Sequence, residues 1–195
     1  GTYNLSGSGV LSVDTLRLGR SGTGIFNQNG GEVIVRNNAQ LAAHNDGNGT
    51  YNMSDGLLTV TNHLDVTDDD TGIGLFNQTG GTVDIGTTLD LISQAGGQGT
   101  YEMSGGSLGA PTLDIGASSG SALFDWDGGV LAIDTMDVNV NGEFNGADAT
   151  DLVIGTLNML ATGALVDMGS NALSLSSGGS IVGGMVKTSD LNVLG

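Results

Sequence analysis

Seven aromatic residues, placed at nearly equal intervals, constrain the fold of this chain most strongly. All its tyrosines and phenylalanines belong to the series: Tyr3, Phe26, Tyr51, Phe76, Tyr101, Phe124 and Phe144. Their spacings are 23, 25, 25, 25, 23 and 20 residues. A period in this range is typical of repeat architectures, in which each unit packs only against its neighbours. The series therefore predicts a stack of similar units instead of one globular core.

The sequence around each ring repeats as well. Gly-Thr-Tyr occurs at 1–3, 49–51 and 99–101, whereas Phe-Asn-Gln occurs at 26–28 and 76–78, so two kinds of unit alternate. In each unit the ring-bearing strand is followed by a Gly-rich turn and by a second strand of period two. A third apolar strand lies 12 to 15 residues after the ring. Three short strands with tight turns form one coil of a solenoid.

One coil cannot bury its apolar face, but stacked coils bury a continuous one. We therefore predict an all-β fold, a right-handed parallel β-helix (β-solenoid) with about eight or nine coils of 20–27 residues. Residues 1–142 are expected to form regular coils, and 143–195 divergent terminal coils or a cap of the same solenoid. The strand alternation leaves open whether the rings point inward, because Leu5 and Gln28 occupy equivalent places.

The charge of the chain excludes several classes of partner. The net charge is −17, and the only fixed cations are Arg17, Arg20, Arg36 and Lys187. Such a polyanion does not release counterions from nucleic acid and is repelled by anionic membrane surfaces, so we expect no nucleic-acid partner. No stretch approaches the roughly 18 apolar residues of a membrane span, so we expect no membrane insertion. The chain starts with Gly1 instead of Met, which indicates a processed product or an excised piece.

The repeat strings resemble a known group of exported proteins. Residues 49–60 and 76–85 are similar to autotransporter-associated β-strand repeats and to repeats of PEP-CTERM-type exported proteins. The resemblance covers about residues 1–133. It implies a secreted bacterial β-solenoid, located extracellularly or at the cell surface, with a role in surface display, matrix or adhesion.

Four units carry a carboxylate in the middle of the third strand. These residues are Asp65, Asp90, Asp114 and Asp137, here called the acidic ladder. Stacked at strand spacing, like charges repel one another unless water or cations separate them. One hypothesis is that the ladder binds divalent cations or a basic partner surface. The alternative is a solvated face that keeps the solenoid soluble.

Residues 137–148 match the spacing of a calcium-binding loop. The candidate ligands are Asp137, Asn139, Asn141, Glu143 and Asp148. Gly142 stands where such a loop turns sharply, and calcium takes six to eight oxygen ligands. The segment looks like the first calcium loop of a dockerin module, although no second loop is found. Phe144 keeps the repeat register, so the alternative is an ordinary coil rich in Asn, Asp and Gly.

Two further polar patterns stand out. The acidic links 45–48 and 68–70 are either ordinary turns or additional calcium sites. The residue after each ring is Asn at Asn4, Asn27, Asn52 and Asn77. Stacked side-chain amides can hydrogen-bond along the solenoid axis, so a structural role is predicted for this column.

Catalysis finds little support in the sequence. His44 and His63 are the only histidines, both lie in or near links, and no Gly-x-Ser-x-Gly nucleophile motif occurs. The negative charge disfavours acidic polysaccharides, whereas hydrolysis of neutral glycans by paired carboxylates stays open. Trp126, the only tryptophan, stands at a core-type position. We therefore predict that the chain is not an enzyme.

These observations favour a structural function. We expect a non-catalytic extracellular protein, a cell-surface or matrix solenoid that self-associates end to end into filaments through unpaired strand edges. One alternative is an adhesin or carbohydrate-binding display module, with a surface glycan or protein as ligand. The second is a glycan-active β-helix enzyme. Calcium is the only candidate cofactor.

Overall fold

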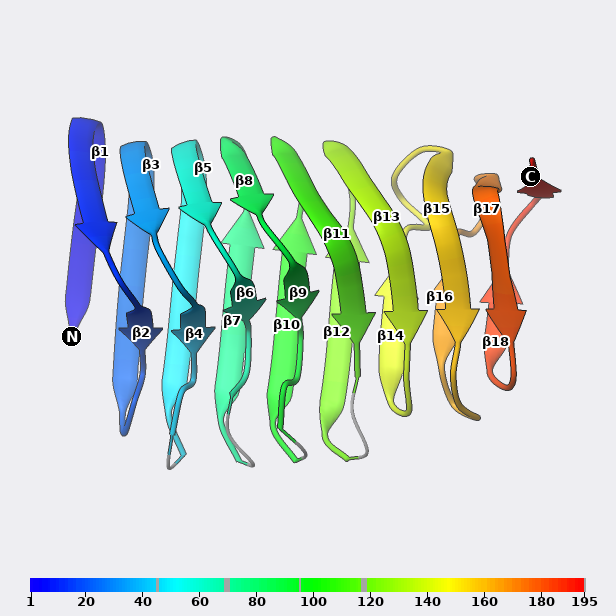
Figure 1. Ribbon diagram of the computed structural model, residues 1–195, viewed down its shortest axis with the longest axis horizontal. Helices are drawn as coiled ribbons and strands as arrows, with labels where there is room; N and C mark the ends of the chain where they lie inside the picture. The colour runs from blue at the N-terminus through cyan, green and yellow to red at the C-terminus, as the bar shows by residue number, and fades with distance from the viewer. Residues whose placement is uncertain (45, 69–70, 95, 117–118, 195) are drawn as a thin grey trace.

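The computed structural model is a β-solenoid of about eight turns. It describes residues 1–44, 46–68, 71–94, 96–116 and 119–194. Within these residues all regular structure is β-strand, and every strand pairing is parallel. Figure 1 shows the coils stacked side by side along the long axis, with the chain ends at opposite ends of the stack. The predicted fold class is confirmed.

Each coil has three faces. Strands β1 (Thr2–Val13), β3 (Thr23–Val35) and β5 (Asn48–Val60) pass through the first and second faces. The first face continues with β7 (Ile73–Gln78), β10 (Gln98–Met103), β12 (Ser121–Trp126), β14 (Gly142–Asn145), β16 (Leu165–Asp167) and β18 (Met185–Lys187). We number the coils 1 to 9 in chain order by these first-face strands.

The remaining strands complete the second and third faces. The second face also contains β8 (Thr82–Ile85) and β19 (Leu191–Val193). The third face contains β2 (Leu16–Leu18), β4 (Ala39–Leu41), β6 (His63–Asp65) and β9 (Thr88–Asp90). The second and third faces share β11 (Ser107–Ile115), β13 (Val130–Val138), β15 (Leu152–Met159) and β17 (Leu173–Ile181).

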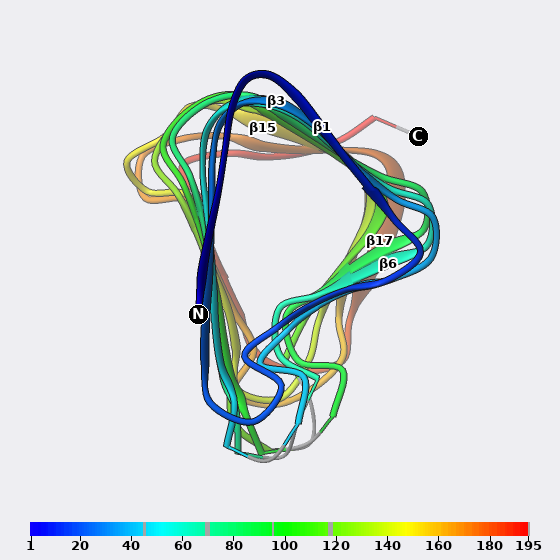
Figure 2. The ribbon, with the colours of Figure 1, turned by 90° about the vertical axis from the view of Figure 1, so that its left-hand side faces the viewer.

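The solenoid is right-handed. In Figure 2 the N-terminal end faces the viewer, and the chain turns clockwise as it runs away from the viewer. Viewed along the axis, the cross-section of the solenoid is a triangle whose third face bends inward (Figure 2). We call the turn between the first and second faces the first corner, and the connection from the third face to the next coil the third corner.

The seven aromatic rings form one internal stack. They pair in register across coils 1 to 7, from Tyr3 opposite Phe26 to Phe124 opposite Phe144. Adjacent ring centroids lie 4.6–5.4 Å apart with interplanar angles of 5–24°. Six of the rings are buried, whereas Tyr3, at the end of the stack, is 49% exposed. The rings therefore point inward, and their stacking adds to the burial of the core.

Two buried glutamines explain why the sequence left the ring direction open. Gln28 and Gln78 point into the core beside the rings and are fully buried. The hydroxyl of Tyr101 donates to Oε1 of Gln78 at 2.7 Å, and Tyr51 donates to Gln28 at 2.6 Å. The amide of Gln78 donates to the carbonyl of Ser107 at 3.0 Å. A buried polar side chain is tolerated where such partners satisfy it.

The asparagine column forms on the outer side of the first face. The amide of Asn27 donates to Oδ1 of Asn4 at 2.7 Å, and the amide of Asn52 donates to Asn27 at 2.8 Å. Farther along the same column, Asn145 donates to Asp125 at 2.7 Å. These bonds join successive coils along the axis, as the sequence predicted.

Tight glycine turns form the first corner in coils 2 to 6. At Gly31 the backbone has φ 75°, and a Cβ atom would lie 2.3 Å from the carbonyl oxygen of Gly9 in the coil before. Only glycine fits there, because a side chain would meet the backbone of the neighbouring coil. The Gly-rich turns of the repeat are therefore set by close stacking.

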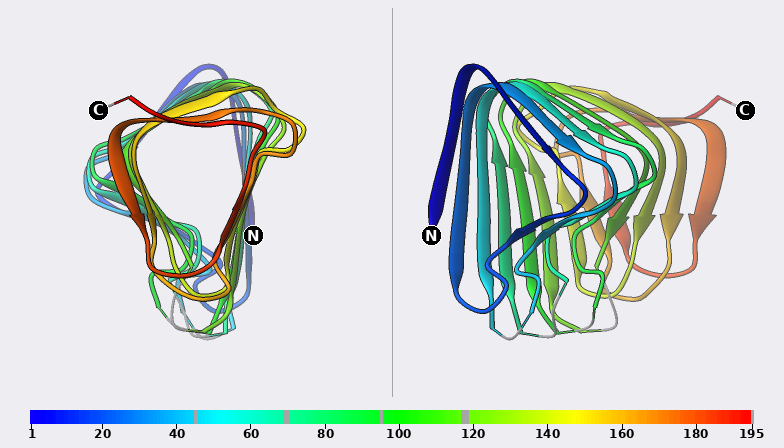
Figure 3. Two further views of the ribbon diagram at one scale, coloured as in Figure 1. Left: turned by 90° about the vertical axis from the view of Figure 1, so that its right-hand side faces the viewer. Right: turned by 60° about the vertical axis from the view of Figure 1, so that its left-hand side comes forward.

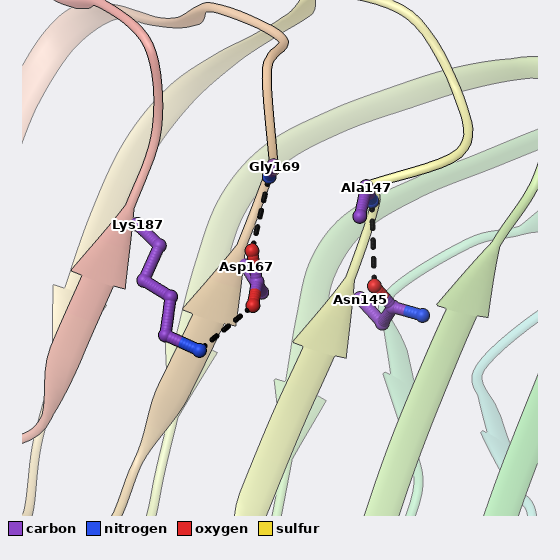
Figure 4. Close-up of polar contacts among 5 residues, drawn as sticks. All are labelled: Asn145, Ala147, Asp167, Gly169 and Lys187. Atoms are coloured by element: carbon purple, nitrogen blue, oxygen red, sulfur yellow. Dashed lines mark hydrogen bonds and ion pairs between the residues drawn. The ribbon is translucent and has the colours of Figure 1, made fainter.

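The first corner is longer in coils 7 and 8. Residues 146–151 and 168–172 connect the two faces there and protrude from the corner, as Figures 2 and 3 show. Each connection opens with an Asx turn, in which Asn145 Oδ1 accepts from the N–H of Ala147 at 3.3 Å and Asp167 Oδ1 accepts from the N–H of Gly169 at 3.0 Å (Figure 4). The coils after residue 142 nevertheless stay in parallel register with those before.

Candidate functional site

The third face brings the four residues of the acidic ladder into one row. Asp65 lies opposite Asp90, Asp90 opposite Asp114, and Asp114 opposite Asp137. The row continues into Asn158 on β15. Parallel register places equivalent residues roughly 4.8 Å apart along the axis. The carboxylates are therefore near neighbours, and each needs a partner or partial neutralisation.

Amide groups partner several of these carboxylates. Asn139 donates to Asp114 at 2.7 Å, and Asn158 donates to Asp137 at 2.8 Å. The backbone N–H of Ile92 donates to Asp90 at 3.0 Å. The ladder is also set into the protein surface, and Asp65 is only 7% exposed. The solvated face considered from the sequence therefore describes the ladder incompletely.

Burial shifts the acidity of the ladder. Desolvation, followed by the charge of Asp68, raises the pKa of Asp65 to about 6. Desolvation, followed by the charge of Asp114, raises the pKa of Asp90 to about 7. The pKa of Asp114 is raised as well, again mainly by desolvation. Near neutral pH the row therefore holds part of its carboxyl groups in the protonated form, which lowers the repulsion between coils.

A groove of about 490 Å³ runs beside the middle of the ladder. Its lining includes Asp90, Ile92, Ser93, Asp114, Asn139 and Leu160. Next to it, Asp68 accepts hydrogen bonds from Gln40 and, at 2.6 Å, from Ser93. The lining of the groove thus combines carboxyl groups with apolar side chains. Such a surface suits a ligand that presents hydrogen-bond donors or positive charge.

The five residues of the predicted calcium loop are spread over several parts of the coil. Asp137 lies on β13 and Asn139 follows it, and both side chains already bond to other coils. Glu143 is exposed on β14, beside the buried Phe144. Asp148 lies in the connection at the first corner. The segment follows the solenoid path because Phe144 anchors it in the aromatic stack.

The acidic side chains of the described residues form no preassembled metal site. Among the described residues, no group of three or more His, Cys, Asp or Glu side chains is placed to hold a metal ion. Of the acidic links, Asn45, Asp69 and Asp70 lie outside the described residues. Calcium binding stays a prediction, which calorimetric titration of the chain with calcium tests directly.

The sequence places Trp126 at a core position, as observed at the end of β12, but it did not predict the gap in the sheet beside this residue. The indole of Trp126 is buried, and its N–H has no hydrogen-bond partner in the described structure. Nearby, the backbone pairing between β13 and β15 is interrupted on the second face. The shortened spacing of 20 residues between Phe124 and Phe144 was the one signal in the sequence that coil geometry changes here.

The comparisons with known proteins add no family. A scan against family models finds no match, and comparison with curated proteins and with solved structures finds none either. Within the described residues no helix is long and apolar enough to cross a membrane. The fold thus defines a parallel β-solenoid repeat protein, and the resemblance to exported bacterial repeats stays a prediction.

Proposed function

We propose that this chain is a non-catalytic structural solenoid of the bacterial cell exterior, and that its units stack end to end into filaments. The observation that carries the proposal is the chemistry of the two end rows. At the C-terminal end, β17 and β19 expose the apolar residues with which core columns end, among them Ile181, Leu191 and Val193. Stacking another unit there would bury them.

The N-terminal end offers matching residues in the same columns. The register places Leu11 and Val13 in the two core columns of the second face that end at Leu191 and Val193. The half-exposed Tyr3 belongs to the column that ends at Val186. A second copy added in register would therefore place apolar side chains on apolar side chains and continue the backbone ladder.

The exterior charge supports filaments that stay separate from one another. The net charge of the chain is −17, whereas the core columns end in apolar residues such as Leu11 and Val193. Like charge on the long sides opposes lateral bundling, while the ends remain free to associate. The same distribution of charge suits a stiff rod that extends outward from a cell surface.

Electron microscopy and light scattering of the chain, with and without calcium, test this proposal. We expect thin filaments at a protein concentration of roughly tens of micromolar, which corresponds to the dissociation constant of a weak interface. The variant Val193→Asp should abolish them, because it buries a charge at the interface. Asn192→Asp is the matched control, since its side chain adds the same charge to the same strand but points outward. A chain that stays monomeric at high concentration contradicts the proposal.

A second candidate function rests on one pair of carboxyl groups. Asp90, with its pKa raised to about 7, neighbours Asp114 at the groove. Glycan hydrolysis uses two carboxyl groups, one as general acid and the other as base or nucleophile. Release of reducing ends from soluble neutral glycans, lost in Asp90→Asn but kept in the exposed control Asp84→Asn, would establish it. Binding without cleavage on a glycan array would favour the display-module alternative.

A further inference from the structure

The sheet of the second face is interrupted between coils 6 and 7. β11 and β13 pair along both the second and third faces, and so do β15 and β17. β13 and β15 pair only along the third face, from Thr135 opposite Thr156 to Val138 opposite Met159. All of residues 119–194 are described. In Figure 1 the upper ends of β13 and β15 lie farther apart than those of β11 and β13.

Two strand edges border this break. The backbone groups of successive residues in a strand point to alternate sides. The N–H of Leu152 donates to a carbonyl of the coil 8 side at 2.9 Å, so the N–H and C=O of Val153 face the break. The N–H of Val130 donates to a carbonyl of coil 5 at 2.9 Å, so the backbone of Leu131 and Ile133 faces the break from the other edge.

A cavity of about 280 Å³ lies at the break. Its lining includes Trp126, Leu131, Asp151 and Leu152. Trp126 is 3% exposed, and among the described residues its indole N–H is the only buried side-chain nitrogen or oxygen without a partner. A buried donor without a partner is rare in a folded protein and marks a place where an acceptor is missing.

Acidic residues surround the break. They are Asp127, Asp134, Asp148 and Asp151, and all four are exposed. None of the four fixed cations of the chain lies between residues 37 and 186. The rim therefore attracts a positively charged ligand and repels a second copy of this acidic chain.

We propose that the break binds an extended, positively charged segment of another protein, which enters as an added strand between β13 and β15. Such a segment finds unpaired backbone groups on both sides, a mode of recognition known from other sheet edges. Every second side chain would point toward Trp126, where small or polar residues fit. This site lies on a side face, so it is separate from the stacking of the ends.

The single tryptophan makes the break directly observable. We would titrate the chain with the synthetic peptide Lys-Val-Thr-Val-Thr-Val-Lys and record the fluorescence of Trp126, the only tryptophan. The Val193→Asp background keeps end stacking out of the measurement. We expect a saturable shift of the emission. A peptide with glutamate in place of lysine should bind about tenfold more weakly at low salt.

Two further tests remove backbone donors. Val153→Pro deletes one N–H that faces the break, whereas the bond from Leu152 to coil 8 is kept. We expect a loss of affinity of about tenfold. Val10→Thr, which changes an equally exposed valine on β1, away from the break, is the matched control. On the ligand side, a peptide with proline in place of each valine should not bind, and this test needs no protein variant.

Several outcomes would overturn the proposal. One is the absence of a saturable fluorescence change with the lysine peptide at millimolar concentration. Another is equal binding of the valine and proline peptides, which would mean that strand pairing is not involved. A shift that depends on protein concentration alone would instead place a second copy in the break.

Discussion

Coils 2 to 5 and coils 7 and 8 have their longer connections at different corners of the triangular cross-section. In the earlier coils the first corner is a tight glycine turn, and the longer connection lies at the third corner, as after β4 and before β5. In the later coils the third corner is short, and residues 146–151 and 168–172 extend the first corner. Figures 2 and 3 show the connections 146–151 and 168–172 at the first corner, away from the third corner.

Stacking therefore preserves the shape of the core cross-section and tolerates differences in coil length. The core changes its content as well, because the aromatic column ends at Phe144 and continues with Val166 and Val186. The break between β13 and β15 lies where the long connection changes corner. The change in corner thus coincides with the one interruption of the second face in residues 119–194.

The two regions should differ most in the energetics of the aromatic column. Phe76→Ala removes a fully buried ring with a ring stacked on each side. We expect a loss of about 4 kcal/mol in the free energy of unfolding. Val166→Ala, in the same column of coil 8, should lose about 1.5 kcal/mol because it leaves a smaller cavity. Urea denaturation measures both, and equal losses would erase the distinction between the regions.

The buried glutamines belong only to the earlier coils. Gln78→Met introduces the residue that stands at this position in coils 3 and 5, but it leaves the hydroxyl of Tyr101 and the carbonyl of Ser107 without their partner. We expect a loss of about 2 kcal/mol. Adding Tyr101→Phe should restore part of it, since one orphaned group is removed. No recovery in the double variant would show that the hydroxyl bond does not matter.

The acidic ladder should make stability depend on pH. The pKa of Asp90 is 3.8 in a model peptide and about 7 in the folded chain, so the folded state holds the proton more tightly. The contribution of Asp90 is therefore most favourable below pH 4, falls as the pH rises toward 7, and is constant above. Asp90→Asn should stabilise the chain at pH 8 by about 2 kcal/mol, or roughly 5 °C in Tm, and change little at pH 3.5.

The exposed Asp84→Asn is the control for that experiment, because it removes the same charge from the second face. If both variants raise Tm equally at pH 8, general repulsion explains the gain and the ladder has no special part. Thermal unfolding followed by circular dichroism at the two pH values is sufficient.

Among the described residues the later coils contain one ion pair, and we expect its effect to be the smallest. Lys187 Nζ lies 2.9 Å from Asp167 Oδ2 (Figure 4). This hydrogen bond, together with that from the Gly169 N–H, holds the pKa of Asp167 below its usual value. Lys187→Gln should lose about 0.5 kcal/mol at low salt and less at high salt, as for other exposed pairs. A loss above that of Gln78→Met would contradict this ranking.

The sequence predicted which residues stack on one another better than it predicted the environment of each stacked residue. Ring spacing gave the stack and its register, because a period fixes which residues lie opposite one another. It left the direction of the rings open, since Gln28 in a core column looks like a surface residue until its partners are known. Likewise the row from Asp65 to Asp137 was predicted, but its partial burial depends on neighbouring connections that have no period.

The candidate sites show the same limit. Residues 137–148 match the spacing of both a calcium loop and a solenoid coil. The structure places Phe144 in the aromatic stack, whereas calcium binding stays a prediction. The break in the second face depends on how far β13 and β15 diverge, and only the shortened spacing before Phe144 hinted at it.

The tyrosine–glutamine bonds have a consequence for how such a chain changes length. Each buried tyrosine reaches back to the glutamine of the preceding coil, Tyr51 to Gln28 and Tyr101 to Gln78. Deleting or duplicating a single coil would set two tyrosine coils or two glutamine coils next to each other and strand a polar group in the core. Gene duplication in this solenoid is therefore expected to proceed in pairs of coils, about 50 residues at a time.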